Sequence, residues 1–248
     1  MEDQNKVYQN EMLRILGYID KVLTENGIWY SVAYGTILGA VRENGFIPWD
    51  KDIDVFIKLP QREKARKILK ANLPEDLLYM DCSTNTVGCM DGIMSKEYGD
   101  ETNVDIYTLI GAPNIQTMED SEIRRILKRN KFCTKVFGAK YGDYHKLRKV
   151  YKVLPYLFIK AVLHLVPDCL IRKIILHYEN KFNFDSAPYM MAMMTYRRIT
   201  EIMPSEIYKG TLRHAFENIE VNIPEGYHTF LCRAYGDDYM VPKKNNWE

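Results

Sequence analysis

Three aspartates at alternate positions, Asp50, Asp52 and Asp54, lie beside an apolar run, and this pattern constrains the fold more than any other part of the chain. Ile53 and the run 55–57 are typical of a buried strand. Side chains two residues apart in a strand point to the same face, so the spacing predicts a strand that presents all three carboxylates together. Neighbouring anions repel one another unless a cation lies among them, and Mg²⁺ combines carboxylate oxygens with waters and substrate phosphates. The pattern therefore predicts a metal-dependent site that handles a nucleotide.

A glycine-rich turn precedes the acids and adds to this prediction. If a helix begins at Gly35 and Thr36, backbone N–H groups and a hydroxyl can approach a phosphate at its positive end. The simpler alternative is an edge strand whose acids only face water, because alternation is also the ordinary pattern of a half-buried strand. Charges inside an apolar run are costly without a partner, which favours the site.

Four segments carry a family resemblance, and they occur in order along almost the whole chain. They read G-T-I-L-G-A-V-R at 35–42, F-I-P-W-D-K-D-I-D-V at 46–55, N-V-D-I-Y-T-L at 103–109 and Y-G-D-D-Y-M-V-P at 235–242. Together they resemble the LicD family, a branch of the nucleotidyltransferase-fold superfamily that includes fukutin and fukutin-related protein. A D-x-D pair alone would be weak evidence, whereas the long block followed by two further motifs in the family's order is specific.

The resemblance implies a role for each matching acid. Asp52 and Asp54 become the metal-binding pair, Asp50 an accessory acid, and Asp105 the third carboxylate, which a neighbouring strand brings beside the first two. The expected catalytic residues are thus Asp52, Asp54 and Asp105, and the expected ligands of Mg²⁺ or Mn²⁺ are these three with Asp50. Asp105 also lies in a short β-prone run, although a strand-end aspartate is the plain alternative.

Four further residues are expected to bind the donor. Gly35 and Thr36 would hold its phosphates, Arg42 would face the pyrophosphate, and Trp49 lies beside the acids. An arginine on a short helix is often only a surface residue. Lys51 departs from the family pattern, in which many members carry another acid, and its side chain should point away from the metal.

The resemblance implies transfer of a phospho-alcohol, best known for phosphocholine from CDP-choline, to a glycan or a polyprenyl-linked glycan, with CMP leaving. CDP-ribitol and other activated alcohols serve relatives. Two alternatives stay open: a nucleotidyltransferase that passes NMP to its acceptor and releases pyrophosphate, and a non-catalytic scaffold for glycan assembly.

Hydrophobic periodicity predicts an α+β fold, with a mixed sheet flanked by helices. We expect helices over 7–26 and 60–71, and strands over 29–33, 77–82, 89–96 and 102–109. Residues 1–117 form the expected nucleotidyltransferase-like catalytic core. Residues 118–248 form a mainly helical region that completes the donor and acceptor site.

Composition places the chain among enzymes of the cytoplasm. The formal net charge of +1 gives no argument for nucleic acid binding. Five scattered cysteines favour reduced thiols over a disulfide framework, and no signal peptide is recognised at the start.

The region after residue 118 combines many bases with an apolar stretch at 153–166, which is too short to span a membrane. One interpretation is a helical subdomain that packs on the sheet. The other, over residues 150–176, is a peripheral contact with the inner face of the cell membrane near a lipid-linked acceptor.

The last third is rich in aromatic residues, which hold quaternary ammonium groups over their faces and so suggest a choline pocket. The aromatic candidates are Tyr189, Tyr196, Phe216, Tyr227, Phe230, Tyr235 and Tyr239. Arg197 and Arg198 are candidates for contact with a phosphate or the acceptor.

Overall fold

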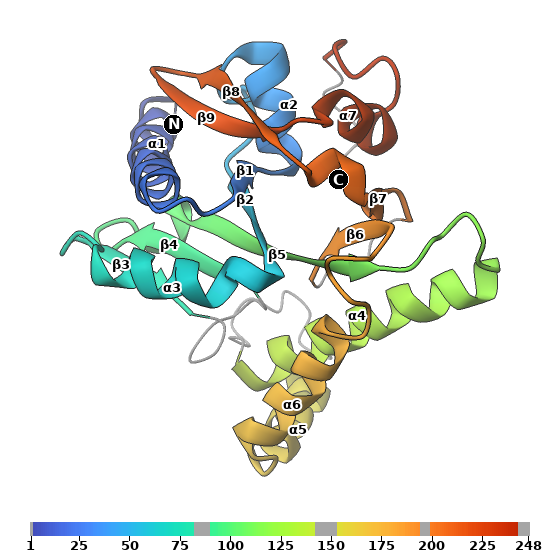
Figure 1. Ribbon diagram of the computed structural model, residues 1–248. Coiled ribbons are helices and arrows are strands. Elements are labelled where there is room, and N and C mark those ends of the chain that lie inside the picture. Colours follow the sequence, from blue (N-terminus) through green and yellow to red (C-terminus); the bar gives the residue numbers. More distant parts are fainter. Residues whose placement is uncertain (1, 82–89, 142–152, 194–198, 243–248) are drawn as a thin grey trace.

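The computed structural model describes residues 2–81, 90–141, 153–193 and 199–242. Its α-helices are α1 (Glu2–Glu25), α2 (Tyr34–Glu43), α3 (Arg62–Ala71), α4 (Asp120–Tyr141), α5 (Val153–His164), α6 (Asp168–Glu179) and α7 (Tyr227–Tyr235). Its strands are β1 (Tyr30–Val32), β2 (Ile53–Lys58), β3 (Leu77–Met80), β4 (Asp91–Ser95), β5 (Val104–Ala112), β6 (Tyr189–Ala192), β7 (Met203–Pro204), β8 (Thr211–Phe216) and β9 (Ile219–Pro224). The predicted α+β class is confirmed, as a curled mixed sheet flanked by helices (Figure 1).

The main sheet has the order β1-β2-β5-β4-β3, with β6 pairing the far half of β5 and β7 pairing β6. β2 and β5 are parallel to each other, whereas the other pairs of this sheet are antiparallel. A parallel pair requires a long crossover, and here α3, β3 and β4 supply it. β2 and β5 therefore form the centre on which the other elements are arranged.

The predicted amphipathic helix at 7–26 is confirmed as α1, whose apolar side is buried against the sheet. Met12, Ile15, Leu16, Ile19 and Leu23 are all fully buried at three-and-four spacing. Gly27 ends the helix with φ +63°, a left-handed conformation that glycine adopts without strain. The predicted strands and the helix at 60–71 also form, the latter as a short 3₁₀ turn (Leu59–Gln61) followed by α3.

The prediction that one strand carries all three aspartates is wrong. β2 begins at Ile53, so Asp54 lies in the strand, whereas Asp50 and Asp52 precede it in an extended segment after a turn at Pro48 and Trp49. A strand forms only where the pleated backbone finds a partner, and the described partners of β2, the strands β1 and β5, begin to pair with it at Val55 and Ile53. The acids are therefore positioned by two different kinds of backbone.

The second half of the chain joins the first at several places. β6 extends the sheet, and the β8–β9 hairpin lies over β1 and α2 at the top of Figure 1. Helices α4, α5 and α6 extend below the sheet in the same view. The proposed division at residue 117 stays a prediction. Strand β6 of the second part pairs with β5 of the first, and β9 contacts β1.

A buried ion pair ties this helical region to the sheet. Arg62, at the start of α3, donates two hydrogen bonds to the carboxylate of Glu179 at the end of α6, and the side chains are 10% and 3% exposed. A bidentate guanidinium–carboxylate pair fixes both position and orientation. The end of α6 is thus held at a defined place beside α3.

Breaking this pair should destabilise the fold, because it leaves a buried guanidinium without its main counter-charge. We expect Glu179→Gln to lower the free energy of unfolding by about 3 kcal/mol in urea denaturation. Asp120→Asn is the matched control, since Asp120 and Arg124 form an exposed pair at 3.7 Å, and it should leave the midpoint unchanged. Equal midpoints for both variants would contradict the anchoring role.

Candidate active site

Asp54 and Asp105 lie directly opposite each other on the parallel strands β2 and β5. Adjacent strands are about 4.8 Å apart, and partners in register point to the same face of a sheet. Both residues are half-buried, while Ile53, Val55, Val104 and Ile106 beside them are fully buried. The apolar neighbours set the register, so the two carboxylates are held together by the packing of the core.

The pKa values of both carboxyls are raised by burial and by neighbouring acids. Burial raises the pKa of Asp54 well above its usual value, and the charges of Asp105, Asp52 and Asp50 raise it further. Burial and the charge of Asp52 raise the pKa of Asp105 to about 6, although a hydrogen bond from Asn103 opposes the shift. Asp52, which is exposed, thus lies within electrostatic range of both buried acids. The four acids share one region of negative potential.

The start of α2 supports this region, as the glycine turn suggested. The hydroxyl of Thr36 accepts a hydrogen bond of 3.0 Å from the backbone N–H of Asp54 and so fixes the first turn of the helix to β2. A Cβ on Gly35 would lie 2.6 Å from a carboxylate oxygen of Asp50, so a side chain at this position would displace that carboxylate. Burial and the charge of Asp52 raise the pKa of Asp50. The structure thus places the Asp50 carboxylate beside Gly35, and the contact of Gly35 and Thr36 with donor phosphates stays a prediction.

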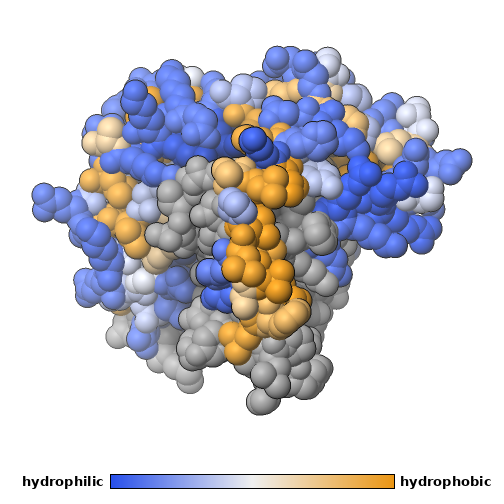
Figure 2. Space-filling model, turned by 90° about the horizontal axis from the view of Figure 1, so that it is seen from below, coloured by the Kyte–Doolittle hydropathy of each residue, from blue (hydrophilic) through white to orange (hydrophobic). Residues whose placement is uncertain are grey.

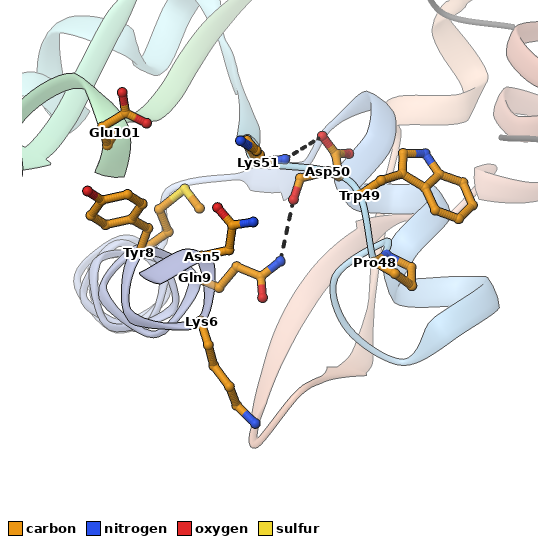
Figure 3. A pocket seen from close by; sticks show the side chains of 10 residues that line it. Asn5, Lys6, Tyr8, Gln9, Pro48, Trp49, Asp50, Lys51 and Glu101 are labelled. Carbon is orange, nitrogen blue, oxygen red and sulfur yellow. Dashed lines mark hydrogen bonds between the residues drawn. The ribbon is translucent and has the colours of Figure 1, made fainter. Parts of the chain in front are cut away.

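Trp49 belongs to a pocket of about 440 Å³ next to the acids. Figure 3 shows Asn5, Tyr8 and Gln9 of α1 on one side of this pocket, the loop 48–51 on the other, and Glu101 beyond them. The side-chain amide of Gln9 donates to the carbonyl oxygen of Asp50, which links α1 to the loop. The pocket therefore borders the acidic region through Asp50 and Lys51.

Arg42 is not brought to the acids. It lies in the last turn of α2, about 10 Å along the helix from Gly35. Its buried guanidinium donates to Glu43 at 2.7 Å and to the carbonyl oxygen of Tyr239 at 3.2 Å. In this structure Arg42 ties α2 to the segment after α7, so a contact with pyrophosphate stays a prediction that needs another support.

Three residues near the acids had no role assigned from the sequence. Asn103 donates to a carboxylate oxygen of Asp105, and Tyr107 lies close enough to Asp54 and Asp105 that their charges add to the burial that raises its pKa. Tyr34 begins α2 with φ +43°, which is uncommon outside glycine. Its ring packs on that of Tyr107, with 5.3 Å between the ring centroids. The alternation of Asn103, Asp105 and Tyr107 was the signal that could have placed them on one face.

The aromatic residues of the last third are spread over different parts of the structure. Phe230 packs against Tyr34 and Phe56 near the acids. Phe216 packs on Phe46, and Tyr239 on His228. Tyr196, Arg197 and Arg198 lie outside the described residues.

The donor set fits a divalent ion that is completed by substrate. Within the described ranges, no group of three or more His, Cys, Asp or Glu side chains is placed to hold a metal by itself. The two adjacent carboxylates have raised pKa values, and neither forms an ion pair with another described residue, so a cation would relieve their charge. Mg²⁺ takes few protein ligands and keeps positions for waters and phosphates, so a preformed cage is not required.

Residues 27–120, which include the paired carboxylates, match the family model described as LicD/FKTN/FKRP, nucleotidyltransferase domain. This match, and a relative that covers almost the whole chain, support the resemblance to the LicD family that the motifs predicted.

The relatives range from a long match to short ones. The chain is 24% identical to lipopolysaccharide cholinephosphotransferase LicD of Haemophilus influenzae over 94% of its own length and 91% of that protein. It is 51% identical to uncharacterized proteins of Rickettsia prowazekii and Rickettsia typhi, over 49 and 37 residues that cover 18% and 12% of those proteins.

We expect Asp54→Asn to stabilise the protein at pH 7 in the absence of divalent ions. Because the folded-state pKa of Asp54 is raised, its ionisation favours unfolding, and this penalty is absent below the unfolded pKa of about 4 and grows as pH rises above it. The melting temperature should rise by roughly 2–4 °C at pH 7, and the gain should disappear toward pH 4. The exposed Asp185→Asn should leave it unchanged. A lower melting temperature for Asp54→Asn would show that its charge is already compensated within the protein.

Proposed function

We propose that this protein is a transferase that moves a phospho-alcohol, phosphocholine first among the candidates, from a CDP-activated donor to a hydroxyl of a cell-surface glycan or its lipid-linked precursor. The observation that carries the proposal is the in-register pair of Asp54 and Asp105 beside the start of α2. The similarity over 94% of the chain to a lipopolysaccharide cholinephosphotransferase supports the choice of alcohol and acceptor.

The reaction is a direct displacement at phosphorus. The oxygen of an acceptor hydroxyl forms a bond to the phosphorus that bears the alcohol, the bond from that phosphorus to the bridging oxygen breaks, and CMP leaves with the bond's electrons. The hydroxyl proton passes to a carboxylate or to water. Since the donor and acceptor are fixed relative to each other, positioning supplies much of the rate.

The chain's own residues have separate tasks in this proposal. Asp105 is the candidate to orient the acceptor hydroxyl and take its proton, because Asn103 already holds its carboxylate. Thr36 and Gly35 keep Asp54 and Asp50 in place at the start of α2. A divalent ion, Mg²⁺ or Mn²⁺, would be held by Asp52 and Asp54 with Asp105, Asp50 lying beside them, and would neutralise the pyrophosphate charge.

The pocket beside Trp49 suits part of a substrate. Two lysines, Lys6 and Lys51, line it together with Glu101 and Tyr8. Cationic side chains beside the acidic region favour an anionic group of the donor or acceptor. We place the protein in the cytoplasm, peripheral to the inner face of the cell membrane, where a lipid-linked acceptor is accessible.

The product formed decides between this proposal and its closest alternative. With Mg²⁺, CDP-choline and a water-soluble glycan fragment, we expect CMP release and a choline-bearing glycan. Asp54→Asn and Asp105→Asn should reduce the rate by at least about 1,000-fold, because a transition-state charge loses its compensation. Pyrophosphate release from CTP would support a nucleotidyltransferase instead. If neither Mg²⁺ nor Mn²⁺ binds in the presence of CDP-choline, a non-catalytic scaffold is favoured.

A thermal-shift panel of CDP-choline, CDP-ethanolamine, CDP-glycerol and CDP-ribitol would identify the donor, because a ligand that binds only the folded state raises the melting temperature.

Gly35→Ala tests how closely Asp50 must approach α2. The new Cβ would collide with the Asp50 carboxylate, so we expect kcat/KM for transfer to fall roughly 10- to 100-fold with the fold intact. Gly17→Ala in α1 is the matched control, because nothing lies within 4 Å of a Cβ there. Full activity in Gly35→Ala would show that the position of Asp50 does not matter for transfer.

A further inference from the structure

Helices α5 and α6 form a hairpin that exposes an unusual amount of apolar surface. Figure 2 shows this surface as an orange band on the underside of the molecule. We call it the apolar face of the α5–α6 hairpin and define it by Phe158, Ile159, Val162, Leu165, Leu170 and Ile174. Phe158 is 71% exposed and Leu165 84%, and the other four are 44–49% exposed. Such a contiguous patch marks an interaction site.

The apolar face is additional to the face that packs on the protein. In α6, Ile171 is 4% exposed and belongs to a second hydrophobic cluster with Ile126 of α4, while Ile175 and Tyr178 pack against that cluster. Leu170 and Ile174 lie one turn apart on α6, outside the side of the helix that packs against this cluster. In α5 and the linker, Phe158, Val162 and Leu165 also follow the spacing of a single helix face. The hairpin therefore has one side for the core and another that no described part of the chain covers.

Basic side chains accompany this face. Among the side chains described on α5 and α6, the sole acid is Glu179, which is buried against Arg62. Lys173 is exposed, and α4, which lies against α5, exposes Arg124, Arg125, Lys128 and Lys131. Desolvation and the charges of Arg129 and Arg125 lower the pKa of Lys181, so these bases lie near one another.

An apolar face on a hairpin that packs beside a helix with more exposed bases than acids is complementary to one partner in particular, the surface of an anionic membrane. The apolar side chains enter the boundary of the acyl chains, and the lysines and arginines meet the head groups. Spanning is excluded for these helices, because each has 12 residues and a bilayer requires about 20. No helix in the described part of the chain is long and apolar enough to cross a membrane.

We propose that the apolar face of the α5–α6 hairpin docks this protein on an anionic lipid surface, with the hairpin lying in the head-group region. This inference deepens the proposed function, since the docked protein would reach the lipid-linked acceptor at the membrane surface. Its physical basis is independent of any transfer chemistry. The tie between Glu179 and Arg62 then fixes the height of the sheet above the lipid.

Vesicle flotation of the full chain tests the proposal. We expect it to float with phosphatidylcholine vesicles that contain roughly 30% phosphatidylglycerol, and much less with pure phosphatidylcholine or at about 0.5 M salt. Phe158→Ser combined with Leu165→Ser should lower the partition coefficient at least about tenfold, because two anchoring side chains are lost. The matched control replaces exposed apolar residues elsewhere, Leu212→Ser with Val241→Ser, and should bind as the unchanged protein does.

Three results would overturn the docking surface. One is a chain that stays at the bottom of the gradient with anionic vesicles at low salt. Another is equal loss of binding in both double variants. The third is a dimer without vesicles that the Phe158 and Leu165 changes convert to a monomer while vesicle binding persists, which would make this face an interface between copies of the chain.

Transfer to a water-soluble glycan fragment separates this inference from the proposed function. The Phe158 and Leu165 double variant should retain that activity while losing vesicle binding, since neither residue lies at the carboxylates. Vesicle binding without any transfer would overturn the proposed function alone.

Discussion

The candidate site depends on two carboxyl groups being held side by side by the sheet. Asp54 and Asp105 are adjacent because β2 and β5 pair in parallel over six residues each, with isoleucine and valine buried on both sides of the acids. A shift of one residue would turn Ile53, Val55 and Ile57 to the opposite face, so the hydrophobic core maintains an electrostatically unfavourable contact. The cost falls on the carboxyls, whose pKa values rise. A neutral amide would give a more stable sheet, so a structural role alone does not explain these acids.

The surroundings of the pair are arranged to orient the acids without neutralising them. Thr36 accepts from the backbone of Asp54, and Gly92, opposite Asp105, leaves room for the amide of Asn103, whose oxygen would lie 2.6 Å from a Cβ at that position. The hydrogen bonds therefore involve neutral groups, and glycine contributes only space. The arginines before residue 80 are used elsewhere: Arg62 and Arg66 pair with Glu179 and Asp91, Arg42 with Glu43, and Arg14 with Glu11 and Asp76. The site therefore keeps a negative potential, which the proposed divalent ion would neutralise.

The sequence predicted the elements well and their side-chain roles less well. Periodicity placed α1, α3 and the strands β1 to β5, because apolar spacing is decided locally. The family resemblance implied that Asp105 lies beside Asp54, and the register bears this out. Periodicity also placed Asp50 and Asp52 in the strand, because spacing cannot show where pairing starts. The tie of Arg42 to the carbonyl of Tyr239 spans 197 residues, and no local pattern reports a contact between such distant positions. The position of Asn103 beside Asp105 could have been predicted, because it precedes Asp105 by two residues.

The chain of contacts between the acids and the apolar hairpin is short, which gives the two proposals a common geometry. β2 leads from Asp54 through the turn at Leu59–Gln61 directly into α3, whose first residue, Arg62, binds the last residue of α6. Both ends of this path are buried, so the hairpin cannot move far without breaking an ion pair that is costly to leave unmade. A rigid path of this kind would keep the carboxylates at a constant distance from a surface that the hairpin occupies. An acceptor attached to a lipid also has a fixed distance from that surface to its reactive hydroxyl. Matching the two distances is a form of positioning that a freely diffusing glycan would not require.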